Sequence, residues 1–302
     1  MSNSGIKIFA PACVSMHSFG MPNLSIAMDN PGNEIIAHID EKNIYATIDL
    51  YSKEKDDKNN TKEIVLDIAN AFLKYINSNK GIRFEILNKI PFDSGLGQLE
   101  SSVTGSIVAI NDILKSHLDK QEIFKFLIEK IQDYNIEINP SNIAANLFGG
   151  IILYNKNTNN PIQKIYSPYG INFSLILMKR EINNGTFDSL DPIHLLDQSS
   201  NIALLIKGLM ISDLDLIADA LKNNELERFF TNKIFEEIKR ISYKNDVYSV
   251  GFSHLGESII IMNPNSLIED KNSKELEKYL KNNGEKFKIL TAKLNLNGLY
   301  KY

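Results

Sequence analysis

The sequence predicts an α+β protein whose strands and helices occur in both halves of the chain. Residues 82–87 alternate apolar and polar side chains, which is typical of a strand. Residues 64–76 instead repeat apolar side chains every three or four positions, which is typical of an amphipathic helix. The chain has 302 residues, enough for two domains. We place their boundary in the Asn-, Lys- and Thr-rich segment 155–161, so that the domains span residues 1–158 and 159–302.

The first domain is predicted to open with strands and to continue with alternating helices and strands. Residues 11–25 have no clean period, and we interpret them as a loop that turns back on itself. Pro31 and Gly32 are interpreted as a turn, and Thr61 as a helix N-cap. The expected strands are residues 6–10, 26–28, 34–38, 44–50, 82–87 and 151–154, and the expected helices are residues 61–76, 103–114 and 121–132.

The second domain is predicted to mix the same two kinds of element. The expected strands are residues 173–178, 247–252, 258–262 and 286–294, and the expected helices are residues 199–210, 214–221, 235–241 and 273–280.

The composition argues against several classes of protein. The net charge is −4 and the Lys and Glu residues are mixed along the chain, which gives little support for nucleic-acid binding. The single cysteine, Cys13, excludes an internal disulfide framework and fits a reducing cytosol; we interpret it as a small packed residue. No run approaches eighteen apolar residues, so we expect a cytoplasmic protein without membrane spans.

The strongest functional signal is a loop with two glycines, Gly95 and Gly97, between the strand at 82–87 and the next helix. Glycine allows a positive φ and a close approach of the backbone to a ligand. The amides of the first helical turn would then face an anion, which the helix dipole also attracts. The spacing matches neither a Walker loop nor a Rossmann fingerprint, and an ordinary tight turn is the alternative.

Five segments together resemble the GHMP small-molecule kinases, and within them most closely the homoserine kinase family. The five segments are residues 8–12 (IFAPA), residues 90–97 with the helix after them, residues 142–150 (NIAANLFGG), the glycine turn at 253–258, and the final strand. The resemblance spans nearly the whole chain. It implies an N-terminal domain like ribosomal protein S5 domain 2 and a ferredoxin-like C-terminal domain. It also implies transfer of the γ-phosphoryl group of ATP, with Mg²⁺, to the hydroxyl of L-homoserine in threonine biosynthesis.

The resemblance assigns site residues as well. Nucleotide contacts are implied for Pro91, Ser94, Gly95, Leu96, Gly97, Gln98, Ser101 and Ser102. Substrate contacts are implied for Ser15, Gly20, Asn142, Ser253 and Gly256. Glu100 and Glu129 are the candidate metal ligands, and no catalytic residue is assigned. The partner is a small-molecule substrate rather than a nucleic acid or a membrane, and a homodimer is one option for the assembly.

Several chemical positions depart from the family pattern. Gln98 and Leu99 stand where the family has two serines that serve phosphate and metal. Met21 and Pro22 follow Gly20 where the family has Phe and Asp, and Ser15-Met16 replaces the usual Ala-Asn, so the side chains expected to hold the amino acid are missing. The other departures are Ile131 near the position of a metal-binding Glu, Asn139-Pro140-Ser141-Asn142 in place of His-x-Asp-Asn, Leu190 near an expected Arg, and residues 253–258 (SHLGES) in place of a Ser-Gly-rich turn.

Glu100 and two histidines stand in or beside these motifs without a family counterpart. Glu100 either replaces the missing acid or is a solvated residue at a helix start, and we expect the solvated role because the dipole favours acids there. His17 and His254 are expected to be hydrogen-bonded surface or turn residues.

Three functions therefore stay open. The first is a homoserine kinase that is rewired at its site, and the second is a GHMP kinase for another hydroxylated metabolite. The third is a non-catalytic relative that serves as a binding or regulatory protein. The first accounts best for the whole pattern of motifs.

Overall fold

The computed structural model describes residues 5–16, 21–41, 43–52, 60–132, 138–166, 168, 170–178, 192–224, 232–253 and 258–302. His17, Gly20, Leu190, His254 and Gly256 lie outside the described residues.

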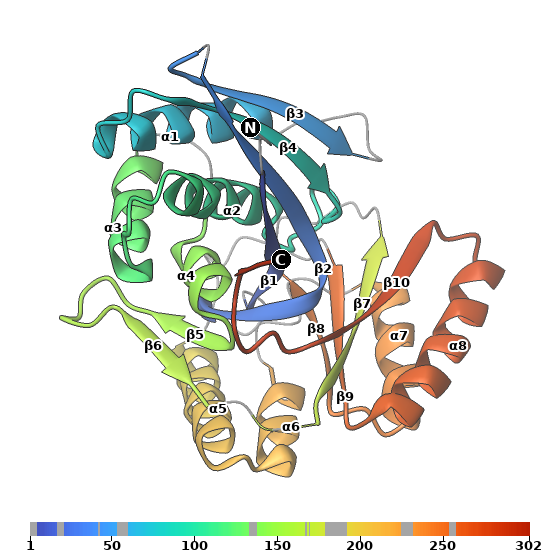
Figure 1. The fold of residues 1–302 in the computed structure, drawn as a ribbon. Coiled ribbons are helices and arrows are strands. Elements are labelled where there is room, and N and C mark those ends of the chain that lie inside the picture. Colours follow the sequence, from blue (N-terminus) through green and yellow to red (C-terminus); the bar gives the residue numbers. More distant parts are fainter. Residues whose placement is uncertain are drawn as a thin grey trace.

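The first half of the chain forms a large sheet with helices on one face (Figure 1). Its elements are β1 (Ile6–Met16), β2 (Met21–Asp40), β3 (Ala46–Ser52), α1 (Thr61–Tyr75), β4 (Gly81–Asn88), α2 (Gln98–Ile113), α3 (Lys120–Ile131), α4 (Pro140–Phe148), β5 (Ile151–Tyr154) and β6 (Ile162–Ile165). The sheet has seven strands in the order β11-β1-β2-β4-β3, and β5 joins the far end of β2 and carries β6. Helices α1 to α4 bury their apolar sides against it. Gly105 lets α2 lie close to β2, because a Cβ at this position would lie only 2.5 Å from the side chain of Ile35.

The predicted loop at residues 11–25 is wrong where the structure describes it, because β1 and β2 form one long antiparallel pair. The register runs on from Pro11↔Gly32 to Met16↔Met21, with residues 29–31 left unpaired as a bulge. The predicted turn at Pro31 and Gly32 is therefore wrong. Pro31 lies in a bulge inside β2, where its missing N–H removes no ladder hydrogen bond, and Gly32 is paired with Pro11. The alternation of side chains was hidden because residues 8–16 are buried on both faces.

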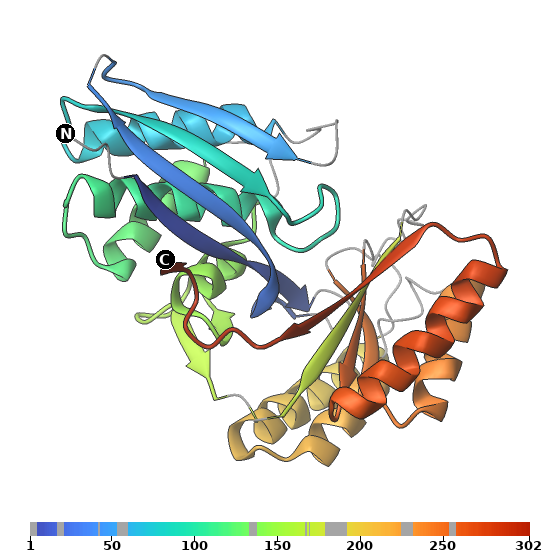
Figure 2. The same cartoon turned by 45° about the vertical axis from the view of Figure 1, so that its right-hand side comes forward.

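The second half forms a smaller antiparallel sheet in the order β10-β7-β9-β8 (Figure 2). Its elements are β7 (Asn172–Met178), α5 (Pro192–Ile211), α6 (Leu214–Lys222), α7 (Lys233–Lys244), β8 (Ser249–Ser253), β9 (Ser258–Asn263), α8 (Ser266–Asn282), β10 (Phe287–Lys293) and β11 (Tyr300–Lys301). Helices α7 and α8 pack on one face of this sheet. Helices α5 and α6, with the ends of β1 and β2, pack on the other face, so the two halves share a core.

The domain boundary at residue 158 stays a prediction. Two strands from beyond it, β6 and β11, belong to the first sheet. β6 pairs with β5, so the first sheet continues to Ile165. β11 returns from the second half to pair with β1. Neither β6, β11 nor α4 was expected from the sequence. None of the helices in the described part of the chain is long and apolar enough to cross a membrane.

Candidate active site

The glycine loop, residues 91–97, connects β4 to α2 and sets up the start of that helix. Gly95 and Gly97 have φ values of 66° and 67°, in the region that favours glycine. Gly97 is the N-cap of α2, and no side chain caps the helix there. The amides of the first turn therefore lack the usual side-chain acceptor, and an anion could supply it.

Both halves of the chain hold the glycine loop in place. Leu96 accepts a hydrogen bond from the amide of Cys13 on β1 at 3.0 Å. The carbonyl of Ser94 accepts hydrogen bonds from the hydroxyls of Ser258 at 2.6 Å and Ser253 at 3.4 Å, which lie where β8 and β9 approach each other. The loop therefore contacts the second sheet directly.

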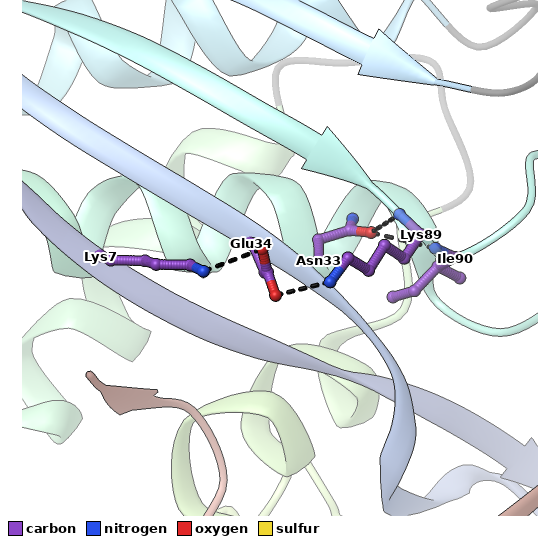
Figure 3. Close-up of polar contacts among 5 residues, drawn as sticks. All are labelled: Lys7, Asn33, Glu34, Lys89 and Ile90. Atoms are coloured by element: carbon purple, nitrogen blue, oxygen red, sulfur yellow. Dashed lines mark hydrogen bonds and ion pairs between the residues drawn. The ribbon is translucent and has the colours of Figure 1, made fainter.

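The approach to the loop is also held by β2, as Figure 3 shows. Asn33 accepts hydrogen bonds at Oδ1 from the amides of Lys89 at 3.0 Å and Ile90 at 3.1 Å. Next to it, Glu34 lies between the ammonium groups of Lys89 and Lys7. The hydrogen bond from Lys89, followed by that from Lys7, lowers the pKa of Glu34.

Gln98, where the family has a serine, is buried in a polar network of its own. Its Oε1 accepts a hydrogen bond from Thr61 at 3.2 Å, and its Nε2 donates to Asn88 at 3.2 Å and to Ser102 at 3.3 Å. The side chain thereby joins the start of α1, the end of β4 and the first turns of α2. Thr61 is the first residue of α1, not its N-cap, which is Asn60.

The hydroxyls of Ser101 and Ser102 are fully buried and also bond the chain itself. Ser101 donates to the carbonyl of Ala10 at 2.8 Å. Ser102 donates to the carbonyl of Gln98 at 3.1 Å and accepts from Asn33 at 2.9 Å. In this arrangement the backbone amides of α2, rather than these hydroxyls, are the groups that remain for a ligand.

A second polar network joins the first turn of α2 to the first turn of α4. Oε1 of Glu100 accepts hydrogen bonds from the amide of Asn139 at 3.0 Å and from Nδ2 of Asn142 at 3.2 Å. Oδ1 of Asn142 in turn accepts from Ser25 at 2.8 Å, and Ser25 bonds Ser141 at 2.5 Å. The expectation of a solvated Glu100 is wrong: its side chain is only 7% exposed, because it points at α4 instead of at solvent.

Cys13 lies beside this network and is fully buried, which confirms its interpretation as a packed residue. Burial raises the pKa of its thiol, and the nearby carboxylate of Glu100 adds to that effect. On the same strands, alternate side chains such as Val14 and Ile26 face an apolar cavity between the two halves. The pleat of β1 and β2 thus separates the polar network from the apolar core.

The structure brings some of the predicted site residues together and leaves others apart. Ser15 is buried on β1 opposite Ser25. Pro91 is half-buried at the start of the glycine loop, and Glu129 is exposed on α3. The sequence did not single out Ser25, Asn33 or Asn88, while Asn139 could have been found as the N-cap before a proline at the first helical position.

The comparisons with known proteins agree with this architecture. Residues 63–150 match the family model described as GHMP kinases N terminal domain. A homoserine kinase of Chlorobium phaeobacteroides (strain BS1) is 28% identical over 234 residues, which cover 70% of this chain and 72% of that protein. The crystal structure of a homoserine kinase from Cytophaga hutchinsonii has a TM-score of 0.86 at 22% identity and covers 100% of this chain and 98% of that one. The crystal structure of the Methanococcus jannaschii mevalonate kinase has a TM-score of 0.69 at 17% identity and covers 97% of this chain and 99% of that one.

Residues 63–150 therefore resemble a GHMP kinase N-terminal domain, and the chain has the overall fold of the GHMP kinases. Among these kinases it resembles the homoserine kinases. The predicted α+β GHMP kinase fold and the predicted resemblance are both confirmed.

Proposed function

We propose that this protein is an ATP-dependent kinase that transfers a phosphoryl group to the hydroxyl of a small metabolite, with L-homoserine as the acceptor. The observation that carries the proposal is the start of α2, where Gly97 caps the helix without a side chain and leaves the first amides for an anion. The relatives named homoserine kinases support the choice of acceptor.

In this proposal the chain acts mainly by positioning its substrates, as phosphoryl transfer requires. The amides that follow Gly97 hold the phosphates of ATP, and the dipole of α2 favours their negative charge. Ser253 and Ser258 fix the glycine loop through Ser94.

The residues present fit Mg²⁺, which binds hard oxygen ligands. Glu100 would hold the cation through its carboxylate. When bound, Mg²⁺ neutralises charge on the phosphate oxygens.

The acceptor site departs from the family pattern, since Met21 and Pro22 lack side chains that could hold an ammonium group. The carbonyl of Pro22 is already bonded by Asn139 at 2.8 Å and Ser141 at 3.1 Å. This observation favours a second candidate, a GHMP kinase for a hydroxylated metabolite without an amino group. The internal bonding of Gln98 and Ser102 favours a third, a non-catalytic relative that serves as a binding or regulatory protein. A cytoplasmic location and a homodimer stay predictions.

The test is ADP formation by the purified protein with ATP, Mg²⁺ and one acceptor at a time. L-homoserine, its analogue without the amino group, and L-serine form the panel. Stimulation by L-homoserine above the other two supports the proposal, and stimulation by the analogue alone supports the second candidate. ATP binding without stimulation by any acceptor supports the non-catalytic relative.

A further inference from the structure

Glu100 is a buried carboxylate whose hydrogen bonds satisfy only one of its two oxygens. Both donors, the amide of Asn139 and Nδ2 of Asn142, reach Oε1. Both donors are neutral, and within the described ranges no Lys or Arg forms an ion pair with this carboxylate. A cation bound at Oε2 would give this carboxylate the opposite charge that the described side chains do not supply.

The ordinary role of an acid at a helix start does not account for Glu100. In a capping box the acid at the third position bonds the backbone of its own N-cap residue, as Glu122 of α3 does with Asp119 at 2.8 Å. Glu100 occupies the same position in α2 but turns away from its own N-cap, Gly97, and bonds α4 instead. Its carboxylate is therefore aimed at the space between two helix starts.

That space adjoins the place where the phosphates of a nucleotide are proposed to bind. A Cβ built on Gly97 would lie 3.4 Å from Nδ2 of Asn142, the same atom that bonds Glu100. Glu129 is exposed on α3 and takes no part in either polar network. The described part of the chain contains no group of three side chains able to hold a metal by themselves. Mg²⁺ does not need one, since it commonly takes one or two carboxylates together with phosphate oxygens and waters.

We propose that Oε2 of Glu100 is the protein ligand of the divalent cation that accompanies the nucleotide, and that Asn139 and Asn142 position this carboxylate through Oε1. The acid would then come from α2 instead of from the position near Ile131 that the family resemblance implies. The inference rests on the proposed nucleotide site, because the phosphates complete the coordination.

The experiment measures ADP affinity by calorimetry with Mg²⁺ and with EDTA. Glu100→Gln keeps the side-chain length and an amide oxygen that can accept both hydrogen bonds, and Glu129→Gln is the matched control on α3. The wild type and Glu129→Gln should bind ADP more tightly with Mg²⁺. In Glu100→Gln the gain from Mg²⁺ should fall about tenfold or more. The affinity in EDTA should be no lower than that of the wild type, because the substitution removes a negative charge beside the phosphates. An unchanged gain in Glu100→Gln, or no gain in the wild type, overturns the inference while ADP binding still supports the proposed function.

A second measurement needs no variant. Mn²⁺ with ADP should broaden the side-chain amide signals of Asn142 and the backbone amide of Gly97 in NMR spectra of the wild type. The amide of Glu122 on α3 serves as the remote reference. Equal broadening at all three positions, or none, would overturn the inference. If the wild type binds no ADP under either condition, the proposed function fails first and this inference falls with it.

Discussion

Helices α2 and α3 both carry a glutamate in their first turn, but the two glutamates make different contacts. Each helix carries a glutamate as its third residue, Glu100 in α2 and Glu122 in α3. In α3, the side chain of Asp119 accepts from the amides of Gln121 at 2.8 Å and Glu122 at 2.9 Å, and Glu122 returns the bond to Asp119. In α2, the cap is Gly97, which has no side chain.

The two helix starts differ in whether a side chain of the protein accepts hydrogen bonds from the first-turn amides. We propose that the uncapped start, that of α2, binds a ligand. The capping box satisfies the free amides of α3 within the helix, so its N-terminus has little to offer an anion. At α2 the glycine offers these amides no side-chain acceptor, and the glutamate bonds a neighbouring helix instead. The residue at the cap, rather than the acid in the first turn, distinguishes the two cases.

The largest expected effect comes from adding a side chain at the α2 cap. In Gly97→Ala the alanine would have to keep a φ of 67°, which is strained for a residue with a side chain. Its Cβ would also lie 3.3 Å from the carbonyl oxygen of Cys13, which adds crowding. We expect a loss of about 2–4 kcal/mol of unfolding free energy and a loss of ADP binding. Gly284→Ala is the matched control, because Gly284 has φ 71° with nothing within 4 Å. Urea unfolding and calorimetry make the measurement, and wild-type ADP affinity in Gly97→Ala would contradict a ligand role for this cap.

The next effect concerns the bond between the two helices. Asn142→Ala removes a donor from Glu100 and the acceptor of Ser25, both of which are buried. Leaving buried polar groups unpaired should cost about 1–3 kcal/mol in urea unfolding. Asn142→Ala should also weaken ADP binding with Mg²⁺ more than in EDTA, because the carboxylate loses a positioning bond. An equal loss under both conditions would mean that the network serves the fold alone.

Removal of the α3 cap should have a smaller effect and leave the ligand untouched. Asp119→Ala deletes the acceptor for two amides of α3, which should cost about 1 kcal/mol in urea unfolding. ADP affinity should stay at the wild-type value, since α3 contributes no amide to the proposed site. A change in ADP affinity as large as that of Gly97→Ala would remove the distinction between the two helix starts.

The sequence was sufficient for the scaffold of the site because its signals are local. Gly95, Gly97 and the strand before them predict the loop through backbone freedom and period alone, and the helix after them follows from its apolar spacing. The burial of Glu100 could not be found in this way. Its position predicts a surface acid, and only the packing of α4 against α2 turns the side chain inward.

The departures from the family pattern were harder to interpret for the same reason. Gln98 could be interpreted only as the loss of a serine, whereas its hydrogen bonds to Thr61 and Asn88 depend on how the start of α1 and the end of β4 lie beside it. The long β1–β2 pair was missed because strands buried on both faces lose their alternation. Short-range sequence patterns therefore predicted most helices and strands. The polar networks depend on contacts between these helices and strands, which local patterns do not encode.

The smallest effect concerns Glu34 on β2, whose ion pairs with Lys7 and Lys89 lie outside the glycine loop (Figure 3). Glu34→Gln should lower stability at pH 7 by about 0.5–1 kcal/mol, because the pairs with Lys89 and Lys7 are close to solvent. The folded pKa of Glu34 is lowered from 4.5, so its contribution is complete above that pH. The difference between wild type and variant should shrink as the pH falls from 4.5 through the lowered pKa.

Urea unfolding from pH 3 to 7 measures this difference, and 1 M NaCl should reduce it by screening. Glu85→Gln is the matched control, since its pair with Arg83 is more exposed and lies within β4, away from the loop. ADP affinity should be unchanged in Glu34→Gln, because Asn33 still holds the amides of Lys89 and Ile90. A loss of ADP binding in this variant would mean that the ion pairs, and not the glycine cap with its anchored loop, set the geometry of the α2 start.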